Sequence, residues 1–507
     1  MSTEPKKFRV FDTMTDNKVA VEPVQPGKIS MYVCGVTVYD LTHIGHARVF
    51  VFFDVVQRVL RHLGYDLRYV RNHTDVDDKI INRAAEVGED PLALSQRFIA
   101  ALDEDMGRLH VHHADVEPKV SDHIPQIVAM VEKLIERGHA YESKGDVYFR
   151  VQSFDSYGKL SHRKLEDMEA GRSGRVSDDE DKKEHPFDFA LWKTAKGDEI
   201  AWESPWGKGR PGWHIECSVM SAEYLGETFD IHGGGRDLIF PHHENEIAQS
   251  EAAHGATFAN HWMHVGMVNV AEVDEAGQVV ERKMSKSLGN FWTTRDVLKG
   301  YHPEAIRYFM HTTVYRNPIT YSVDNLNEAT QRVEYLYTTI ERIDDALARA
   351  DYSVTSPPAA CALDGRGEAL NDFMARLEDE LVDDFNTPRA LALIGEVARI
   401  ANDLTESKKK PKDDVAYTLY KAREALTGGG YLLGFLQQDP KVALLQIRDL
   451  KVGLLGIDPE KVESLIAARV TARGEKDWAK ADAIRDELQA MKVEIMDSPE
   501  GTIWRVA

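Results

Sequence analysis

The chain has 507 residues, 43% of them hydrophobic and 29% charged, which is the composition of a globular protein with room for about three domains. A net charge of −22 argues against nucleic-acid binding by the surface as a whole, so any such partner needs a local basic surface. The sequence has no apolar run of membrane-spanning length, no apolar signal segment at the N-terminus and only three cysteines, so we expect a cytoplasmic protein without membrane contact or a disulfide framework.

The first predicted elements indicate an α/β fold. Residues 30–34 are a short β-prone run, and a helical pattern follows from about Ile44 to Leu63. A second strand pattern covers 67–71, and another helix begins near Asp77. Strand–helix–strand spacing predicts a parallel sheet and therefore a Rossmann-like nucleotide-binding domain.

The pattern changes between about 120 and 230, where helical segments, a hairpin at 146–151 and a long polar tract at 171–184 predict an insertion. Residues 229–232 then resume the sheet, and after Val323 the chain is nearly all helical. We expect a Rossmann-like domain with an insertion, a helical bundle and a small C-terminal α+β unit, over 1–322, 323–456 and 457–507 respectively.

Histidines are confined to the first part of the chain, because all 20 lie at or before His311. His43 and His46 flank Gly45 just after a strand and at the start of a helix, where parallel sheets bind ligands and helix N–H groups attract phosphate. Both imidazoles can donate hydrogen bonds to phosphate oxygens, and Gly45 permits a close approach of the nucleotide. A simple helix cap with two exposed histidines explains the short motif equally well.

A second motif, Lys283–Ser287, follows about 240 residues downstream with the sequence KMSKS. Its lysines, Lys283 and Lys286, are point charges suited to a leaving pyrophosphate. Alone the segment could be a solvated loop, but together with His43–His46 it resembles the paired signatures of class I aminoacyl-tRNA synthetases. Nucleotidylyltransferases carry a similar histidine motif but are much shorter.

Four residues form a candidate zinc site: Cys34, Cys217, His242 and Glu246. His242 and Glu246 are four residues apart and share one helix face, although His243 is three residues from Glu246 and fits as well. Each cysteine alone is more often a buried apolar thiol.

A zinc ion beside a nucleotide site would serve to recognise a substrate thiol. Zinc deprotonates a coordinating thiol, whereas a hydroxyl is a weaker ligand, so the metal can separate cysteine from serine. A discrimination of about 10⁴ corresponds to ~5.4 kcal/mol at 1.36 kcal/mol per tenfold, which an apolar pocket does not supply.

The longer motifs carry a specific resemblance that covers essentially the whole chain. Segments typical of cysteinyl-tRNA synthetases occur at 31–40, 72–79, 209–218, 229–246, 383–388 and 476–478. The resemblance implies that Cys34, Cys217, His242 and Glu246 bind zinc, which selects His242 over His243. It further implies that the cysteine pocket is lined by Thr74, Trp213 and Asp237, and that Lys286 contacts ATP.

These observations predict an enzyme that forms cysteinyl-adenylate from L-cysteine and ATP and transfers the cysteine to tRNA(Cys). We expect one Zn²⁺ per chain, Mg²⁺ with ATP, a monomer, and catalytic roles for His43, His46, Lys283 and Lys286. One alternative is a ligase that transfers cysteine to an amino sugar, which would not need the full tail. Another is a catalytically silent tRNA-binding or regulatory paralogue, against which both intact signatures argue.

The loop at 271–281, just before Lys283, is long. Its length predicts a hairpin that moves together with the Lys283–Ser287 segment.

The tail offers a local surface for a polyanion. Residues 461–496 carry seven basic and seven acidic side chains, a neutral stretch in an acidic chain. Spacings of three or four predict one basic helical face, formed by Arg469, Arg473, Lys476 and Lys480. Trp478 and Trp504 could stack on bases, although burial in a small core is the favoured expectation for each.

Overall fold

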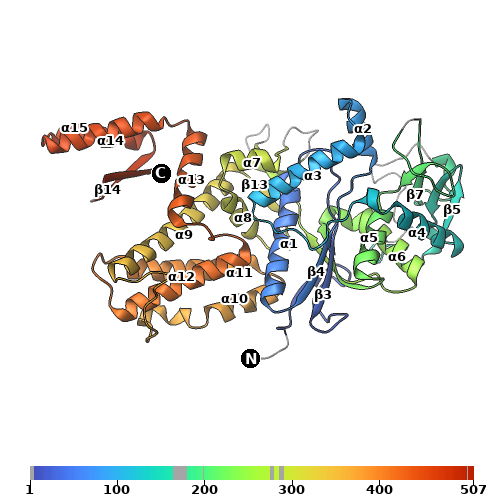
Figure 1. Ribbon diagram of the computed structural model, residues 1–507, viewed down its shortest axis with the longest axis horizontal. Coiled ribbons are helices and arrows are strands. Elements are labelled where there is room, and N and C mark those ends of the chain that lie inside the picture. The colour runs from blue at the N-terminus through green and yellow to red at the C-terminus, as the bar shows by residue number, and fades with distance from the viewer. Residues whose placement is uncertain are drawn as a thin grey trace.

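A computed structural model describes residues 5–163, 180–197, 199–273, 279–284, 291–498 and 501–506. Four parallel strands form the central sheet in the order β10-β9-β3-β4. Their bounds are Lys28–Val33 for β3, Asp66–Arg71 for β4, Phe229–Gly235 for β9 and Ala259–Val265 for β10. Helix α1 (Ile44–His62) connects β3 to β4, which confirms the predicted strand–helix–strand unit and the parallel sheet (Figure 1).

Helix α1 is covered on both sides, which explains its nearly continuous apolar sequence. One side, with Phe53 and Val56, packs in the same core as the sheet and the helical tail. The other side, with Phe50 and Val51, packs among further helices. These helices are α2 (Asp78–Val87), α3 (Pro91–Arg108), α7 (Thr294–Gly300) and α8 (Pro303–His311).

The segment expected as an insertion contains helix α4 (Ile124–Glu136) and a separate antiparallel sheet in the order β5-β6-β7-β8. Its strands are Ala140–Ser143, Asp146–Phe149, Phe189–Thr194 and Gly209–Pro211. The predicted hairpin at 146–151 is misplaced, because 151–153 is a 3₁₀ turn and the hairpin joins β5 to β6. Lys144 and Gly145, both with positive φ, make its tight turn. Of the polar tract 171–184, the first nine residues lie outside the described chain.

Two helices and a second small sheet complete the α/β part. Helices α5 (Ile215–Leu225) and α6 (Glu244–His254) flank β9 in the sequence. Strands β11 (Val268–Val273) and β12 (Val279–Lys283) pair antiparallel, which confirms the expected hairpin, and β13 (Ile319–Tyr321) pairs with β11. The N-terminal hairpin consists of β1 (Arg9–Asp12) and β2 (Asn17–Ala20).

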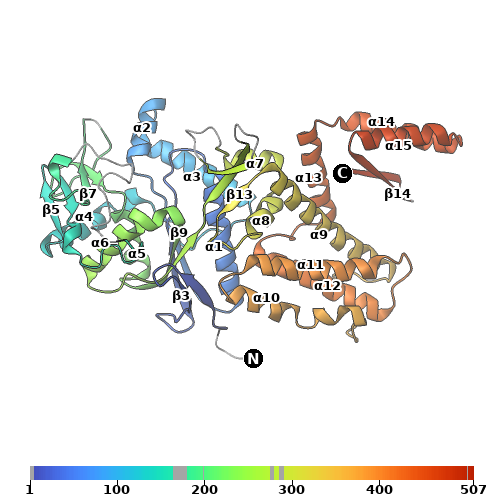
Figure 2. The ribbon, with the colours of Figure 1, turned by 180° about the vertical axis from the view of Figure 1, so that it is seen from behind.

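The tail is helical and extends away from the sheet, with its last elements at the opposite end of the molecule from β5 and β7 (Figures 1 and 2). Its longer helices are α9 (Val323–Arg349), α10 (Phe373–Val382), α11 (Thr387–Thr405), α12 (Asp413–Leu433) and α13 (Pro440–Leu455). The C-terminal unit contains α14 (Pro459–Gly474), α15 (Trp478–Ala490), β14 (Val493–Ser498) and β15 (Gly501–Val506). No helix in the described ranges has the length and apolar character that a membrane span requires.

Two expectations about the C-terminal unit are wrong. The four basic residues do not share one helix, because α14 ends at Gly474 and Lys476 lies in a turn with positive φ. Arg469 and Arg473 instead both pair with Asp497 of β14. Burial is confirmed for Trp504, which is 7% exposed, whereas Trp478 is 59% exposed. Trp478 follows directly after the N-cap of α15, outside the small core that Trp504 occupies.

Candidate active site and metal centre

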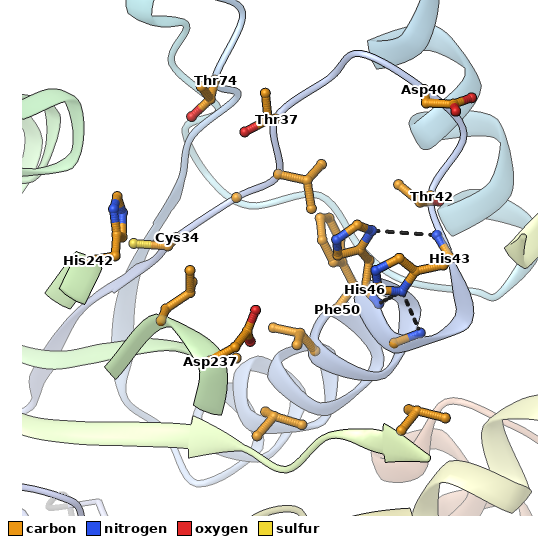
Figure 3. Close-up of a pocket in the computed structure, with 18 of the residues that line it drawn as sticks. Cys34, Thr37, Asp40, Thr42, His43, His46, Phe50, Thr74, Asp237 and His242 are labelled. Atoms are coloured by element: carbon orange, nitrogen blue, oxygen red, sulfur yellow. Dashed lines mark hydrogen bonds between the residues drawn. The ribbon is translucent and has the colours of Figure 1, made fainter. Parts of the chain in front are cut away.

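A cavity of about 350 Å³ opens at the carboxyl ends of β3, β4 and β9. Cys34 and His242 lie toward one end of this pocket and His43 and His46 toward the other, with Asp237 between them (Figure 3). The predicted site residues among its lining are Cys34, His43, Gly45, His46, Thr74, Trp213, Cys217, Asp237 and His242. The fold therefore brings most of the residues singled out in the sequence into one cavity.

The two signature histidines cap helix α1. The His43 Nδ1 accepts hydrogen bonds from the backbone N–H groups of Gly45 at 3.0 Å and of His46 at 3.2 Å, and the His43 N–H is 3.4 Å from the His46 Nδ1. The two rings stack with centroids 3.6 Å apart. Because each Nδ1 accepts a hydrogen bond from the backbone, the proton of each neutral ring is on Nε2, which makes that nitrogen a donor. The helix cap and the phosphate-binding interpretation are thus compatible.

Gly45 is required by the ring of His43. A Cβ atom at this position would lie 2.9 Å from both Cε1 and Nδ1 of His43. We expect Gly45→Ala to displace the His43 ring and to lower ATP–pyrophosphate exchange by about 10- to 100-fold, because a misplacement of about 1 Å can cost that much in rate. Gly107→Ala is the matched control, since a Cβ on this helical glycine meets nothing within 4 Å. Equal exchange by both variants would contradict this role of Gly45.

The four predicted metal ligands lie together in the structure. The Cys34 Sγ lies 3.6 Å from the Cys217 Sγ and 3.3 Å from the Glu246 Oε1. The His242 Nε2 lies 3.6 Å from the Cys217 Sγ and 3.0 Å from the Glu246 Oε1. Tetrahedral zinc, with bonds of about 2.0–2.3 Å, places its ligand atoms about 3.3–3.8 Å apart. Three of the four distances lie in this range and the fourth is 0.3 Å shorter, so the buried group is close to the size that a single zinc ion requires.

His243, the alternative ligand, belongs to a second possible set with Cys34, His232 and Glu246. Its Nε2 is 3.9 Å from the Glu246 Oε1, and its Nδ1 is 2.8 Å from the His264 Nε2. Cys217 and His242 line the cavity, whereas His232 and His243 are not among its lining residues. The set with Cys217 and His242 therefore gives a metal ion access to a molecule in the pocket and supplies two sulfur ligands.

The two thiols of the site, Cys34 and Cys217, have pKa values shifted in opposite directions. Burial raises the pKa of the Cys34 thiol well above its usual range, and its hydrogen bond with Cys217 adds to this shift. Burial also raises the pKa of Cys217, but hydrogen bonds with Cys34 and His242 outweigh it and bring the value to about 6. The pair therefore holds one thiol that ionises readily, and a thiolate is the form that binds a metal.

Further residues orient the ligands. The His214 Nδ1 lies 2.9 Å from the His242 Nδ1, which directs the other ring nitrogen of His242 toward the cluster. The His232 Nε2 donates to the Glu246 Oε2 at 2.8 Å and leaves Oε1 facing the thiols. Sequence analysis missed both supporting histidines, although His214 stands three residues before Cys217 and His232 lies in the predicted strand.

The residues expected to line the cysteine pocket surround the metal cluster. The Trp213 ring stacks on His242 with centroids 4.2 Å apart. The Thr74 hydroxyl donates to the Glu216 Oε2 at 3.0 Å and accepts from the Asn72 amide at 3.2 Å. Burial, followed by the charge of Cys217, raises the pKa of Glu216 well above its usual range. Asn72 and Glu216 were not singled out, although Glu216 adjoins Cys217 and Asn72 is two positions from Thr74.

The lysine segment lies mostly outside the described residues, which stop at Met284 and resume at Phe291, so Lys286 and the side chain of Lys283 are not placed. Both ends of this gap contact the pocket. Met284 and Phe291 line the cavity, and the Phe291 ring meets that of His43 edge-on with centroids 5.4 Å apart. Lys79, which sequence analysis also passed over, adds a cation to the same lining.

Comparison with known proteins identifies the class of this site. A Mycobacterium tuberculosis methionyl-tRNA synthetase, solved with methionyl-adenylate, shares the fold with a TM-score of 0.61 and 16% identity, over 82% of this chain and 93% of that one. Residues 20–331 match the family of class I (C) tRNA synthetase catalytic domains. The fold and the site define a class I aminoacyl-tRNA synthetase.

Relatives that match over the full length narrow the class to one family. The chain is 47% identical over 505 residues to a cysteine–tRNA ligase of Pelobacter propionicus and 49% identical over 500 residues to one of Stutzerimonas stutzeri, in each case over 98% of this chain and 99% of the relative. Residues 459–505 match the cysteinyl-tRNA ligase anticodon binding domain, and residues 376–437 match the DALR domain. The chain belongs to the cysteine–tRNA ligase family, and the family resemblance seen in the sequence is confirmed.

Proposed function

We propose that this enzyme activates L-cysteine with ATP as cysteinyl-adenylate, releases pyrophosphate, and transfers the cysteinyl group to the 3′ end of tRNA(Cys). One observation carries the proposal: a single cavity joins the histidine cap of α1 to a buried cluster with two thiols. The cap suits the phosphates of ATP, and the cluster suits a substrate with a thiol.

Cys34, Cys217, His242 and Glu246 would hold one Zn²⁺ per chain. When bound, zinc supplies preferential coordination of a thiolate, which separates cysteine from serine. Trp213 covers one face of the ligand His242 and closes this end of the pocket. The carboxylate of Asp237 lines the cavity between the cluster and the histidines, where it can accept hydrogen bonds from the ammonium group of cysteine. Thr74 contributes to the opposite wall (Figure 3).

At the nucleotide end, the chain acts by positioning and electrostatic stabilisation. His43 and His46 donate from Nε2 to phosphate oxygens as charge develops, and Gly45 keeps both rings in place. Lys283 and Lys286 neutralise the leaving pyrophosphate, since their segment begins and ends at the pocket. Mg²⁺ accompanies ATP. No side chain forms a covalent bond with the substrate in this scheme.

The proposed division of labour follows the chain: catalysis over 1–322, tRNA binding by the bundle over 323–456 and anticodon recognition over 457–507. The match of residues 459–505 to an anticodon binding domain favours tRNA as the acceptor over an amino sugar. We also propose that the enzyme acts as a monomer in the cytoplasm.

Cysteine-dependent ATP–pyrophosphate exchange tests the proposal. We expect exchange with cysteine to exceed exchange with serine by about 10⁴-fold, because the serine hydroxyl is a poor zinc ligand while the two amino acids have nearly the same shape. Charging of tRNA(Cys) by the same preparation tests the second step. Serine exchange within tenfold of the cysteine rate would refute selection by the metal.

A further inference from the structure

A second group of metal-ligand side chains lies outside the active-site pocket. His73, Asp103 and Glu117 each offer a ligand atom, and these three atoms lie within 4.8 Å of one another. None of the three residues is among the lining of the pocket. His73 follows β4, Asp103 lies on α3, and Glu117 lies in the segment after α3. Three separate parts of the chain therefore converge on one point.

The hydrogen bonding of this group is incomplete without a ligand. His73 is 4% exposed, and its Nδ1 is buried without a hydrogen-bond partner. Buried imidazoles usually pair both nitrogens with protein or water, so an orphan nitrogen requires an explanation. Within the described ranges, no hydrogen bond or ion pair reaches the half-buried carboxylate of Asp103, although Glu117, His113 and Arg71 are its electrostatic neighbours.

Glu117 is held in place by its neighbours. Its Oε2 lies 2.9 Å from the Nδ1 of the exposed His113, and its Oε1 accepts from Arg71 and from the Ala114 N–H. His113 contacts Glu117 but is not part of the group of three. One imidazole and two carboxylates make a donor set that suits a divalent transition metal such as zinc.

The charges around the group carry no excess of positive charge. Asp103 and Glu117 supply two negative charges, and their neighbours Arg71 and Lys119 supply two positive ones, so the sum is 0. Burial lowers the pKa of His73 to about 4, which leaves its imidazole neutral at pH 7 with a lone pair to donate.

We propose that His73, Asp103 and Glu117 form a second site for a divalent transition metal ion. A bound ion ties the end of β4 to α3 and to the segment after α3. His73 directly precedes Thr74, so the ion also fixes one wall of the cysteine pocket from behind. This site contains no sulfur and two of its three ligands are only half-buried, so it binds more weakly than the cysteine-containing cluster.

Calorimetric titration of the zinc-loaded enzyme with Zn²⁺ tests the second site. We expect one additional ion per chain, with an affinity that falls at least tenfold in Asp103→Asn and in His73→Gln. Glu104→Gln is the matched control, because this neighbouring carboxylate on α3 pairs with Arg295 and lies outside the group. The added ion should also raise the melting temperature of the wild type more than that of Asp103→Asn.

Cobalt distinguishes the two sites. A thiolate ligand gives Co²⁺ an intense charge-transfer absorption, so this band should arise from the Cys34–Cys217 cluster alone, while the second ion contributes only weak ligand-field bands. Cys217→Ser should lose the charge-transfer band and keep the second ion. The inference is overturned if no additional ion binds, or if both Asp103→Asn and His73→Gln bind it as the wild type does. Neither result bears on cysteine activation, which rests on the other cluster.

Discussion

Cys217→Ser will lose its zinc and reduce cysteine-dependent ATP–pyrophosphate exchange by about 10⁴-fold, equivalent to ~5.4 kcal/mol at 1.36 kcal/mol per tenfold. Cys217 is buried, lies 3.6 Å from both Cys34 Sγ and His242 Nε2, and is the thiol of the pair whose pKa is lowered, to about 6. A serine hydroxyl fits the same space but stays protonated, so one of the four ligands is removed while the packing is conserved. Metal analysis of the purified protein and exchange assays measure the two effects.

The matched control is Cys361→Ser. Cys361 is exposed and far along the chain from the cluster, so the same chemical change there should leave both zinc content and exchange at wild-type levels. Circular dichroism of both variants establishes that any loss is not a loss of fold. Wild-type zinc content together with wild-type exchange in Cys217→Ser would remove Cys217 from the metal site.

A chain that ends at Gly456 will retain exchange within about twofold but lose about 10³-fold in kcat/KM for tRNA(Cys). The removed unit has a small core of its own, to which the rest of the chain contributes mainly Val452 of α13. Its truncation therefore leaves the catalytic pocket and the bundle core in place. Base–aromatic contacts contribute about 1–3 kcal/mol per base, so the loss of two anticodon contacts accounts for ~4 kcal/mol, or about 10³-fold.

Trp478→Ala refines this experiment within the full-length chain. Its indole is 59% exposed at the start of α15, whereas Trp504 is buried and its Nε1 donates to Glu463 at 2.7 Å. We expect Trp478→Ala to lower tRNA charging by about tenfold through tRNA affinity, with no change in exchange or melting temperature. Trp504→Ala, in contrast, should destabilise the unit.

The truncation at Gly456 has a clear contrary outcome. If the truncated chain charges tRNA like the full chain, the C-terminal unit does not read the anticodon.

Elements that depend on near neighbours in the chain were predictable from residue types and spacing. Apolar periodicity predicted α1 between strands β3 and β4, and the helical tail was evident from the same signal. Residue types and short spacings predicted the pair His43 and His46, which the structure places in one cap. These features are local, because a helix face or a cap is formed by residues within about four positions of one another.

Contacts between side chains far apart in the chain depend on the fold of the whole molecule. Cys34 and Cys217 are 183 positions apart and come into contact because α5 packs beside β3, and only the fold shows that His214 and His232 orient the other ligands. The same reason explains why the predicted basic helical face in the tail was wrong. Arg469 forms an ion pair with Asp497 of β14, which the spacing of residues along a helix could not reveal. The partner of a side chain and its burial depend on how distant segments pack against each other, which local sequence patterns do not encode.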